Sequence, residues 1–130
     1  MKKIILTSFS ILFLLTTLDV YADENHASDE WQIKAYSSAA PSFIGNFATI
    51  IGGNGKVIRE GSNGWTCQAG NPRSFPKKGW KDVHEAMPAC SDKEAMKWMM
   101  AFMTGKTPKL DADGWMWICL LYTSDAADDS

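Results

Sequence analysis

The sequence has 130 residues, of which 45% are hydrophobic and 12% are aromatic, and its formal net charge is −2. A chain of this length has room for one hydrophobic core and therefore for one small domain. Its lysines and arginines are spread along the chain and form no basic stripe, so nucleic acid is not expected as a partner.

Residues 1–22 have the organisation of a secretory signal peptide. Two lysines follow Met1, residues 4–18 are mostly apolar, and small residues precede a cleavage point after Ala22. The apolar stretch, about fifteen residues, is shorter than the roughly twenty that a membrane-spanning helix needs. We therefore expect a periplasmic or secreted mature chain that has no membrane association after signal cleavage.

The next segment, residues 23–42, begins with a cluster of acidic residues: Asp23, Glu24, Asp29 and Glu30. A polar, acidic stretch without apolar periodicity is typical of disorder, and the small residues and proline at 37–41 are typical of a linker. We expect residues 23–42 to be a disordered acidic lead-in and linker, and residues 43–118 to form the ordered domain.

Three short stretches rich in β-forming residues follow, at 47–51, 56–60 and 65–68. Glycine and asparagine fill the segments between them, at 52–55 and 61–64, and favour tight reversals. Strands joined by such short turns pair with their neighbours in the sequence, so we expect an antiparallel β-meander.

One helix is expected over residues 92–104. Ser91 and Glu94 have the spacing of a capping box, and Gly105 followed by Pro108 is typical of a helix end. Four methionines at spacings of three and four share one helix face, which we expect to pack on the sheet: Met96, Met99, Met100 and Met103.

The chain has three cysteines. Exported proteins usually pair their cysteines, and Cys119 belongs to an atypical C-terminal stretch, so we expect Cys67 and Cys90 to form a disulfide. Closing this loop of about two dozen residues stabilises a fold by roughly 3 kcal/mol in the chain-entropy model. The predicted fold class is α+β, with a short antiparallel meander, one amphipathic helix and one disulfide.

The C-terminal stretch, residues 119–129, reads as a translated sequencing-transposon adapter. The run Cys-Leu-Leu-Tyr-Thr-Ser-Asp-Ala-Ala-Asp-Asp follows the adapter codons without a break. The adapter also contributes the third base of codon 118, so the native residue there is Ile or Met. We expect residues 119–130 to be an artefact and the domain at 43–118 to be truncated on its C-terminal side.

A last strand is expected to begin at Trp115. Trp115 and Trp117 share one face of this strand because they are two residues apart. We expect both tryptophans in the core. The alternative is an exposed aromatic stripe that stacks on sugar rings.

Four blocks of the sequence carry a resemblance to known proteins. The longest is Gly-Lys-Val-Ile-Arg-Glu-Gly-Ser-Asn-Gly-Trp-Thr-Cys at 55–67, and the shorter ones are Met-Pro-Ala-Cys at 87–90, Met-Lys-Trp-Met at 96–99 and Gly-Trp-Met-Trp at 114–117. Together they resemble a family of uncharacterised exported bacterial proteins. The resemblance implies an export signal and a further C-terminal half, and it implies no activity.

Few residues carry patterns that favour chemistry. His84, with Arg59 and Glu60, offers the groups of an acid–base pair, and ordinary solvated charges are the alternative. His84, Met87 and Met96 offer imidazole and thioether groups, which are soft ligands that suit Cu(I). Methionines at helical spacing are also common core residues.

The function expected from these patterns is that of an exported domain with a non-catalytic binding or structural role. No catalytic residue and no cofactor are assigned, and the partner is unknown. Two alternatives stay open: an enzyme whose site is completed by a missing C-terminal half, and a soft-metal domain that binds copper through His84 and methionines.

Overall fold

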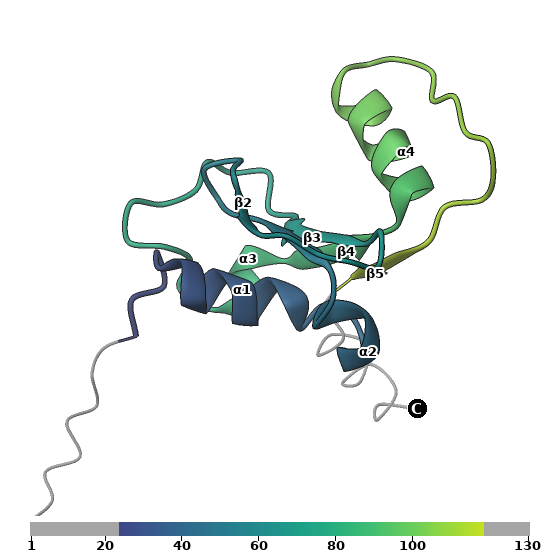
Figure 1. Ribbon diagram of the computed structural model, residues 1–130. Helices are drawn as coiled ribbons and strands as arrows, with labels where there is room; N and C mark the ends of the chain where they lie inside the picture. Colours follow the sequence, from purple (N-terminus) through teal and green to yellow (C-terminus); the bar gives the residue numbers. More distant parts are fainter. Residues whose placement is uncertain (1–23, 119–130) are drawn as a thin grey trace, which may run out of the picture.

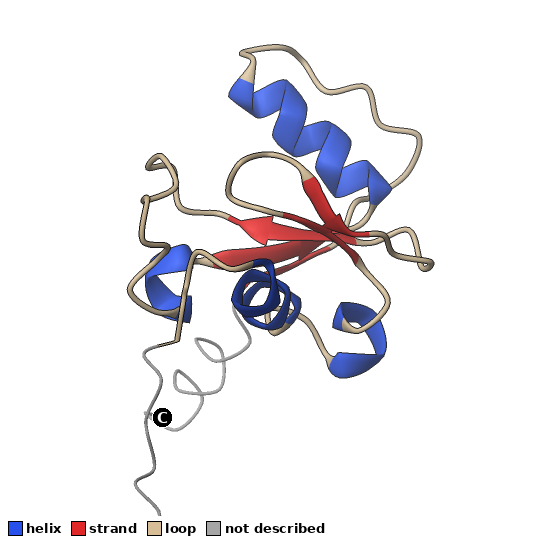
Figure 2. Ribbon diagram, turned by 60° about the vertical axis from the view of Figure 1, so that its left-hand side comes forward, coloured by secondary structure: helices blue, strands red, loops and turns tan. Residues whose placement is uncertain are grey.

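The computed structural model describes residues 24–118. In that part of the chain, a five-stranded sheet carries helices on both of its faces (Figures 1 and 2), so the fold is α+β as predicted. No helix among the described residues is long and apolar enough to cross a membrane. The predicted signal peptide and the adapter-like residues 119–130 lie outside the described residues.

The elements follow one another in the order α1 (Asp29–Ser37), α2 (Ser42–Gly45), β1 (Thr49–Ile51), β2 (Val57–Arg59), β3 (Thr66–Ala69), α3 (Val83–Ala86), β4 (Pro88–Ser91), α4 (Lys93–Met103) and β5 (Met116–Ile118). The order of strands across the sheet is β2-β1-β3-β4-β5. Helices α1, α2 and α3 lie on one side of the sheet, and α4 lies on the other (Figure 2).

The prediction of a disordered lead-in and linker at 23–42 is wrong. Helix α1 begins at Asp29, where the Ser28 hydroxyl caps it by accepting a hydrogen bond from the Trp31 amide at 3.2 Å. Two of the acidic residues that indicated disorder, Asp29 and Glu30, stand in the first helical turn, where the helix dipole favours negative charge. Further along, Trp31, Ala35 and Tyr36 are buried in the core, and so are the alanines of the predicted linker.

The core lies between α1 and the sheet and contains a chain of buried hydrogen bonds. Trp80 donates its indole N–H to the Tyr36 hydroxyl at 3.1 Å, and Tyr36 donates to Gln32 Oε1 at 3.3 Å. Gln32 Oε1 also accepts the Gly53 amide at 2.7 Å, so α1 is joined to the β1–β2 turn. Burial raises the pKa of Tyr36, which keeps this phenol neutral and able to donate.

The predicted antiparallel meander is correct for β1 and β2 but wrong for β3, which runs parallel to β1. After β2 the chain crosses the start of β1: Ser62 N–H donates to Phe47 O, and Thr49 N–H donates to Trp65 O, both at 2.8 Å. This crossing needs Gly61, because a Cβ there would collide with the backbone of Ala48 and Thr49. The sheet is therefore mixed.

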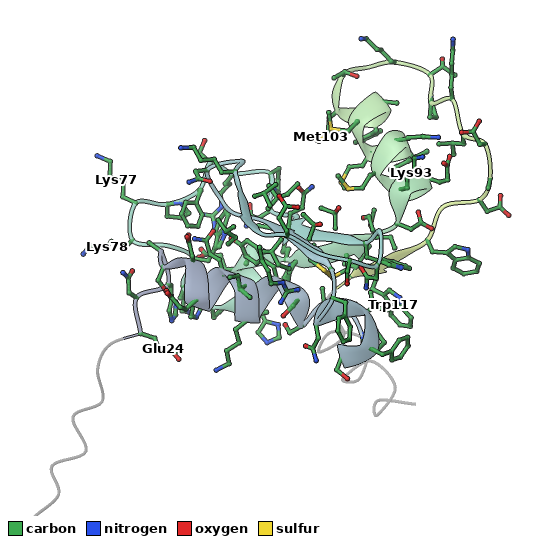
Figure 3. All side chains as sticks on the ribbon, viewed as in Figure 1. Glu24, Lys77, Lys78, Lys93, Met103 and Trp117 are labelled. Carbon is green, nitrogen blue, oxygen red and sulfur yellow. A yellow bond between two sulfur atoms is a disulfide. The ribbon has the colours of Figure 1, made fainter. Side chains whose placement is uncertain are left out.

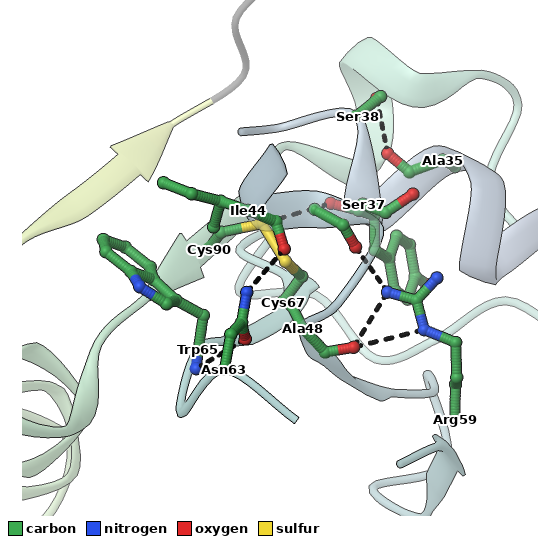
Figure 4. Close-up of a disulfide and its surroundings, with 12 residues drawn as sticks. Ala35, Ser37, Ser38, Ile44, Ala48, Arg59, Asn63, Trp65, Cys67 and Cys90 are labelled. Carbon is green, nitrogen blue, oxygen red and sulfur yellow. Dashed lines mark hydrogen bonds between the residues drawn. A yellow bond between two sulfur atoms is a disulfide. The ribbon is translucent and has the colours of Figure 1, made fainter. Parts of the chain in front are cut away.

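The predicted disulfide between Cys67 and Cys90 is present. It joins neighbouring antiparallel strands, because Cys67 of β3 stands directly opposite Cys90 of β4 (Figure 4). Both cysteines are completely buried, and Cys90 Sγ lies 3.6 Å from the Tyr36 carbonyl oxygen of α1. The disulfide thus lies at the centre of the sheet, against the helix that covers it.

The predicted helix near the C-terminus is present as α4, but its cap and its packing differ from the prediction. Ser91 belongs to β4, and Asp92 caps the helix by accepting the Ala95 amide at 2.8 Å. The methionine face packs on the sheet only in part: Met96 and Met99 are half-buried, and Met99 Sδ lies 3.9 Å from Gln68 Nε2 of β3. Met100 and Met103 are exposed because the C-terminal half of α4 extends beyond the sheet (Figure 1).

We predict that Tyr36→Phe lowers the free energy of unfolding by about 1–2 kcal/mol, because Trp80 then has no acceptor for its buried indole N–H. Urea titration followed by circular dichroism measures this loss. Ser42→Ala, which removes an exposed hydroxyl, is the control. Equal stability of the two variants would contradict the role given to the buried hydrogen bonds.

We predict that the double variant Cys67→Ala, Cys90→Ala loses roughly 3 kcal/mol of stability, because its unfolded chain is no longer constrained. Dithiothreitol should destabilise the parent chain by a similar amount and leave the double variant unaffected. A parent chain whose urea midpoint does not respond to reductant would contradict the disulfide.

Candidate binding surface

Two of the predicted ionisable candidates, Arg59 and Glu60, lie on or next to β2. The Arg59 side chain stabilises the fold by hydrogen bonds to backbone carbonyls. Its guanidinium donates to the Ala48 carbonyl, from Nε at 3.1 Å and from Nη2 at 2.8 Å, and also to the Gly45 carbonyl (Figure 4). These bonds hold the connection between α2 and β1. Glu60 is exposed and lies beyond the end of β2.

His84 lies on α3, which leads into β4, three strands away from β2 in the sheet order. Its neighbour Glu85 accepts the Lys81 amide at 2.6 Å and pairs with Arg73 at 2.7 Å. The Lys81 amide, followed by Arg73, lowers the pKa of Glu85, so this carboxyl group stays ionised near neutral pH. The structure therefore does not bring Arg59, Glu60 and His84 together as one acid–base group.

The candidate soft-metal ligands are separated by β4. His84 and Met87 precede this strand, whereas Met96 lies in α4, after it. Helices α3 and α4 lie on opposite sides of the sheet (Figure 2), so the sheet separates His84 from Met96. Among residues 24–118 no cluster of three or more His, Cys, Asp or Glu residues could hold a metal.

Charged side chains hold the long loop after α4 at two points. At the first, inside the loop, Lys97 Nζ lies 2.7 Å from both Glu94 Oε1 and Asp111 Oδ2, and Glu94 Oε2 accepts the Asp111 amide at 2.9 Å. Lys97 lowers the pKa of both carboxyl groups, and Asp111 followed by Glu94 raises the pKa of Lys97. The loop is thereby drawn back against α4, and Gly114 comes so near Ala95 that a Cβ at residue 114 would collide with its backbone.

At the second point, where the loop ends, Asp92 fixes the start of β5. One of its carboxylate oxygens caps α4, and the other accepts the Trp115 amide at 2.9 Å. The Asp92 amide in turn donates to the Trp115 carbonyl at 3.0 Å. A single side chain therefore sets both the direction of α4 and the position of the last described strand. The sequence signal for this cap was present, one residue later than the capping box that we predicted.

The residues that these contacts position are apolar. We define the β5 surface as Trp65, Trp115, Met116 and Trp117, which line an open groove of about 420 Å³. A second groove, of about 280 Å³, is also lined by Met116, together with Ala95, Trp98, Leu110 and Gly114. Figure 3 shows Trp117 at the β5 end of the sheet and Met103 on the projecting half of α4.

The prediction that Trp115 and Trp117 are core residues is wrong. Trp115 is 70% exposed and Trp117 is 38% exposed. Trp117 stands opposite Cys90 and so faces the same side of the sheet as α1, but α1 packs mainly against β3 and β4. The sequence spacing placed both tryptophans on one face correctly and could not show that the covering helix stops short of them.

Comparisons with protein-family models, with curated proteins and with solved structures gave no match. The resemblance to exported bacterial proteins therefore stays a prediction.

We predict that Asp92→Ala lowers the free energy of unfolding by about 1–2 kcal/mol, because it removes a helix cap and the anchor of Trp115 together. Urea denaturation measures the loss, and near-ultraviolet circular dichroism reports the altered tryptophan environment. Asp113→Ala, in the same loop, is the matched control. Asp92→Ala with the stability of Asp113→Ala would show that Asp92 does not organise this region.

Proposed function

We propose that this chain is an exported domain with a non-catalytic role and that it binds apolar polypeptide through the β5 surface. An export compartment is supported by the Cys67–Cys90 disulfide, because such bonds persist mainly in oxidising environments. The signal-peptide pattern of residues 1–22 supports the same location.

The observation that carries the binding role is the chemistry of the β5 surface. Its groove is lined by three tryptophans and a methionine, with no charged side chain among them. Contiguous exposed apolar surface of this kind marks interaction sites on soluble domains. Tryptophan is also the residue most often responsible for binding energy at the centre of protein interfaces.

A polypeptide fits this surface better than a sugar does. Pockets for small polar ligands combine apolar walls with a few well-placed polar groups that fix orientation. The side chains that line both grooves are apolar apart from the tryptophan indole N–H groups. Apolar side chains of a peptide would satisfy such walls, whereas most hydroxyl groups of a sugar would find no partner.

The two alternatives gain no support from the described residues. An enzyme needs ionisable or nucleophilic groups that converge on one point, and His84 on α3 lies apart from Arg59 and Glu60 at the end of β2. A copper site needs His84, Met87 and Met96 within reach of one ion, and β4 separates them. A site completed by residues outside the described part is favoured by no observation here.

Panning of a displayed peptide library on the disulfide-bonded protein tests the proposal. We expect selected peptides with apolar residues at alternate positions, and we expect Trp115→Ala and Trp117→Ala to weaken their binding by about tenfold or more. Val57→Ala changes an exposed apolar residue on the opposite edge strand and serves as the control. Peptides that bind all three variants equally, or a library that yields no binder, would contradict the proposal.

A further inference from the structure

We infer that the outer end of α4 binds the surface of an anionic lipid bilayer. We define the α4 tip as residues 98–110, which comprise the C-terminal half of the helix and the start of the loop that follows it. In the bound state its apolar side chains enter the headgroup region, and its lysines contact the lipid phosphates. The inference concerns a different surface from the β5 surface, so it does not depend on the proposed function.

The C-terminal half of α4 is apolar on every side. Residues 98–103 read Trp-Met-Met-Ala-Phe-Met, so more than one full turn of the helix carries no polar side chain. A helix that is apolar all round is normally buried, either in a protein core or in a membrane. Within residues 24–118 nothing covers it: Phe102 is 71% exposed and Met103 is 72% exposed.

The position of this segment suits a lipid surface. The C-terminal half of α4 extends beyond the strands (Figures 1 and 3), and Met100, Phe102 and Met103 line neither of the two grooves described above. Residues 98–103 rise about 9 Å along the helix axis, which is comparable with the roughly 5–10 Å that interfacial helices bury in a bilayer. A projecting apolar end can enter a fluid lipid surface, whereas a protein partner needs a matching cavity.

The charge of the α4 tip complements an anionic surface. The tip contains Lys106 and Lys109, both exposed, and no aspartate or glutamate. The acidic residues nearest to it belong to another part of the structure, because Glu94 and Asp111 pair with Lys97 in the first half of the helix. Lysines beside exposed apolar side chains are favoured where a protein meets anionic lipid, since each lysine strengthens such binding about fivefold.

Backbone hydrogen bonds hold the lysine segment next to the apolar residues. Gly105 has a φ of 65°, and the Lys106 amide donates to the Ala101 carbonyl at 2.8 Å. This is the Schellman arrangement, which ends a helix and turns the chain back. Lys106 is therefore held beside the last turn of α4. Phe102 in that turn stacks on Trp98, with ring centroids 5.4 Å apart, so the aromatic side chains of the tip are positioned by each other.

A contact of this kind differs from a membrane span. The sequence prediction of no membrane association was based on length, because the apolar stretch is shorter than the roughly twenty residues of a spanning helix. None of the helices in residues 24–118 is long enough either. A helix end that enters only the interface needs no such length. The inference therefore replaces that expectation with a peripheral and reversible contact.

Flotation with lipid vesicles tests the inference. The disulfide-bonded protein without the predicted signal peptide is mixed with vesicles of equal parts phosphatidylglycerol and phosphatidylcholine, or with vesicles of phosphatidylcholine alone. We expect binding to the anionic vesicles and binding to the neutral vesicles that is about tenfold weaker. We also expect the binding to anionic vesicles to weaken as the salt concentration rises, because salt screens the attraction between lysine and phosphate.

A pair of phenylalanine variants tests the apolar contact. Phe102→Ser should weaken binding to the anionic vesicles about tenfold, because it removes a side chain that leaves water on binding. Phe43→Ser is the matched control, since Phe43 lies on α2 and is also 71% exposed. It should leave the binding unchanged. Both side chains are exposed, so both variants should fold, and circular dichroism checks this.

A pair of double lysine variants tests the charge contact. Lys106→Glu with Lys109→Glu should abolish binding to the anionic vesicles. Lys77→Glu with Lys78→Glu makes the same change of net charge at exposed positions, away from Met103 (Figure 3). This control should keep most of the binding, because its lysines do not contact the lipid.

Four results would overturn the inference. The first is a protein that does not float with anionic vesicles. The second is an equal loss of binding in a tip variant and its control. The third is lipid binding that Trp115→Ala abolishes and Phe102→Ser does not, which would assign the lipid to the β5 surface. The fourth is self-association that Phe102→Ser removes, without vesicle binding, which would assign the tip to a second copy. Peptide binding by the β5 surface is measured separately, so the proposed function stands or fails independently.

Discussion

The pairing of β3 with β4, locked by the Cys67–Cys90 disulfide, is the interaction on which the rest of the structure depends. These two strands occupy the middle of the sheet. On one side of this pair, β3 pairs with β1, which in turn pairs with β2. On the other side, β4 pairs with β5 and is followed in the chain by α4. Because both cysteines face α1, the same bond also supports the buried residues of that helix. Small domains bury little surface, so one covalent link is a large part of their stability.

The helices cover this sheet unevenly, and the β5 surface lies where the cover is incomplete. Helix α1 and its chain of hydrogen bonds through Gln32, Tyr36 and Trp80 close one half of the sheet completely. On the other half, β5 and the outer end of α4 present tryptophan, methionine and phenylalanine to solvent. The contacts of Asp92 and Lys97 hold these apolar residues in place. A surface that is both apolar and firmly positioned suits the binding of another polypeptide segment.

The sequence patterns predicted those features that depend on neighbouring residues. The pairing of the two cysteines, the turn between β1 and β2 and the existence of α4 are of this kind. The helix α1 was missed because acidic residues at its start were taken as a sign of disorder, although Ser28 and the following acids are also a helix start signal. The parallel pairing of β1 with β3 depends on a crossing at Gly61 that local turn chemistry does not reveal.

The candidate site was harder to predict because exposure is a property of the whole fold. The spacing of Trp115 and Trp117 correctly placed them on one face, and their size favoured the core. They are exposed because α1 packs mainly against β3 and β4 and does not cover β5. No sequence pattern near residue 115 indicates how far the cover of α1 extends. His84 and Arg59 were candidate site residues because their side chains can take part in many kinds of chemistry. Only the fold shows that they lie on separate elements.

The most direct test of the central claim, that the exposed tryptophans beside β5 form a binding surface, is an NMR titration of the disulfide-bonded protein with a peptide selected by panning. The account predicts that the indole N–H signals of Trp115 and Trp117 shift on binding, whereas that of Trp80, which is buried beneath α1, does not. Shifts that spare both Trp115 and Trp117 would contradict it.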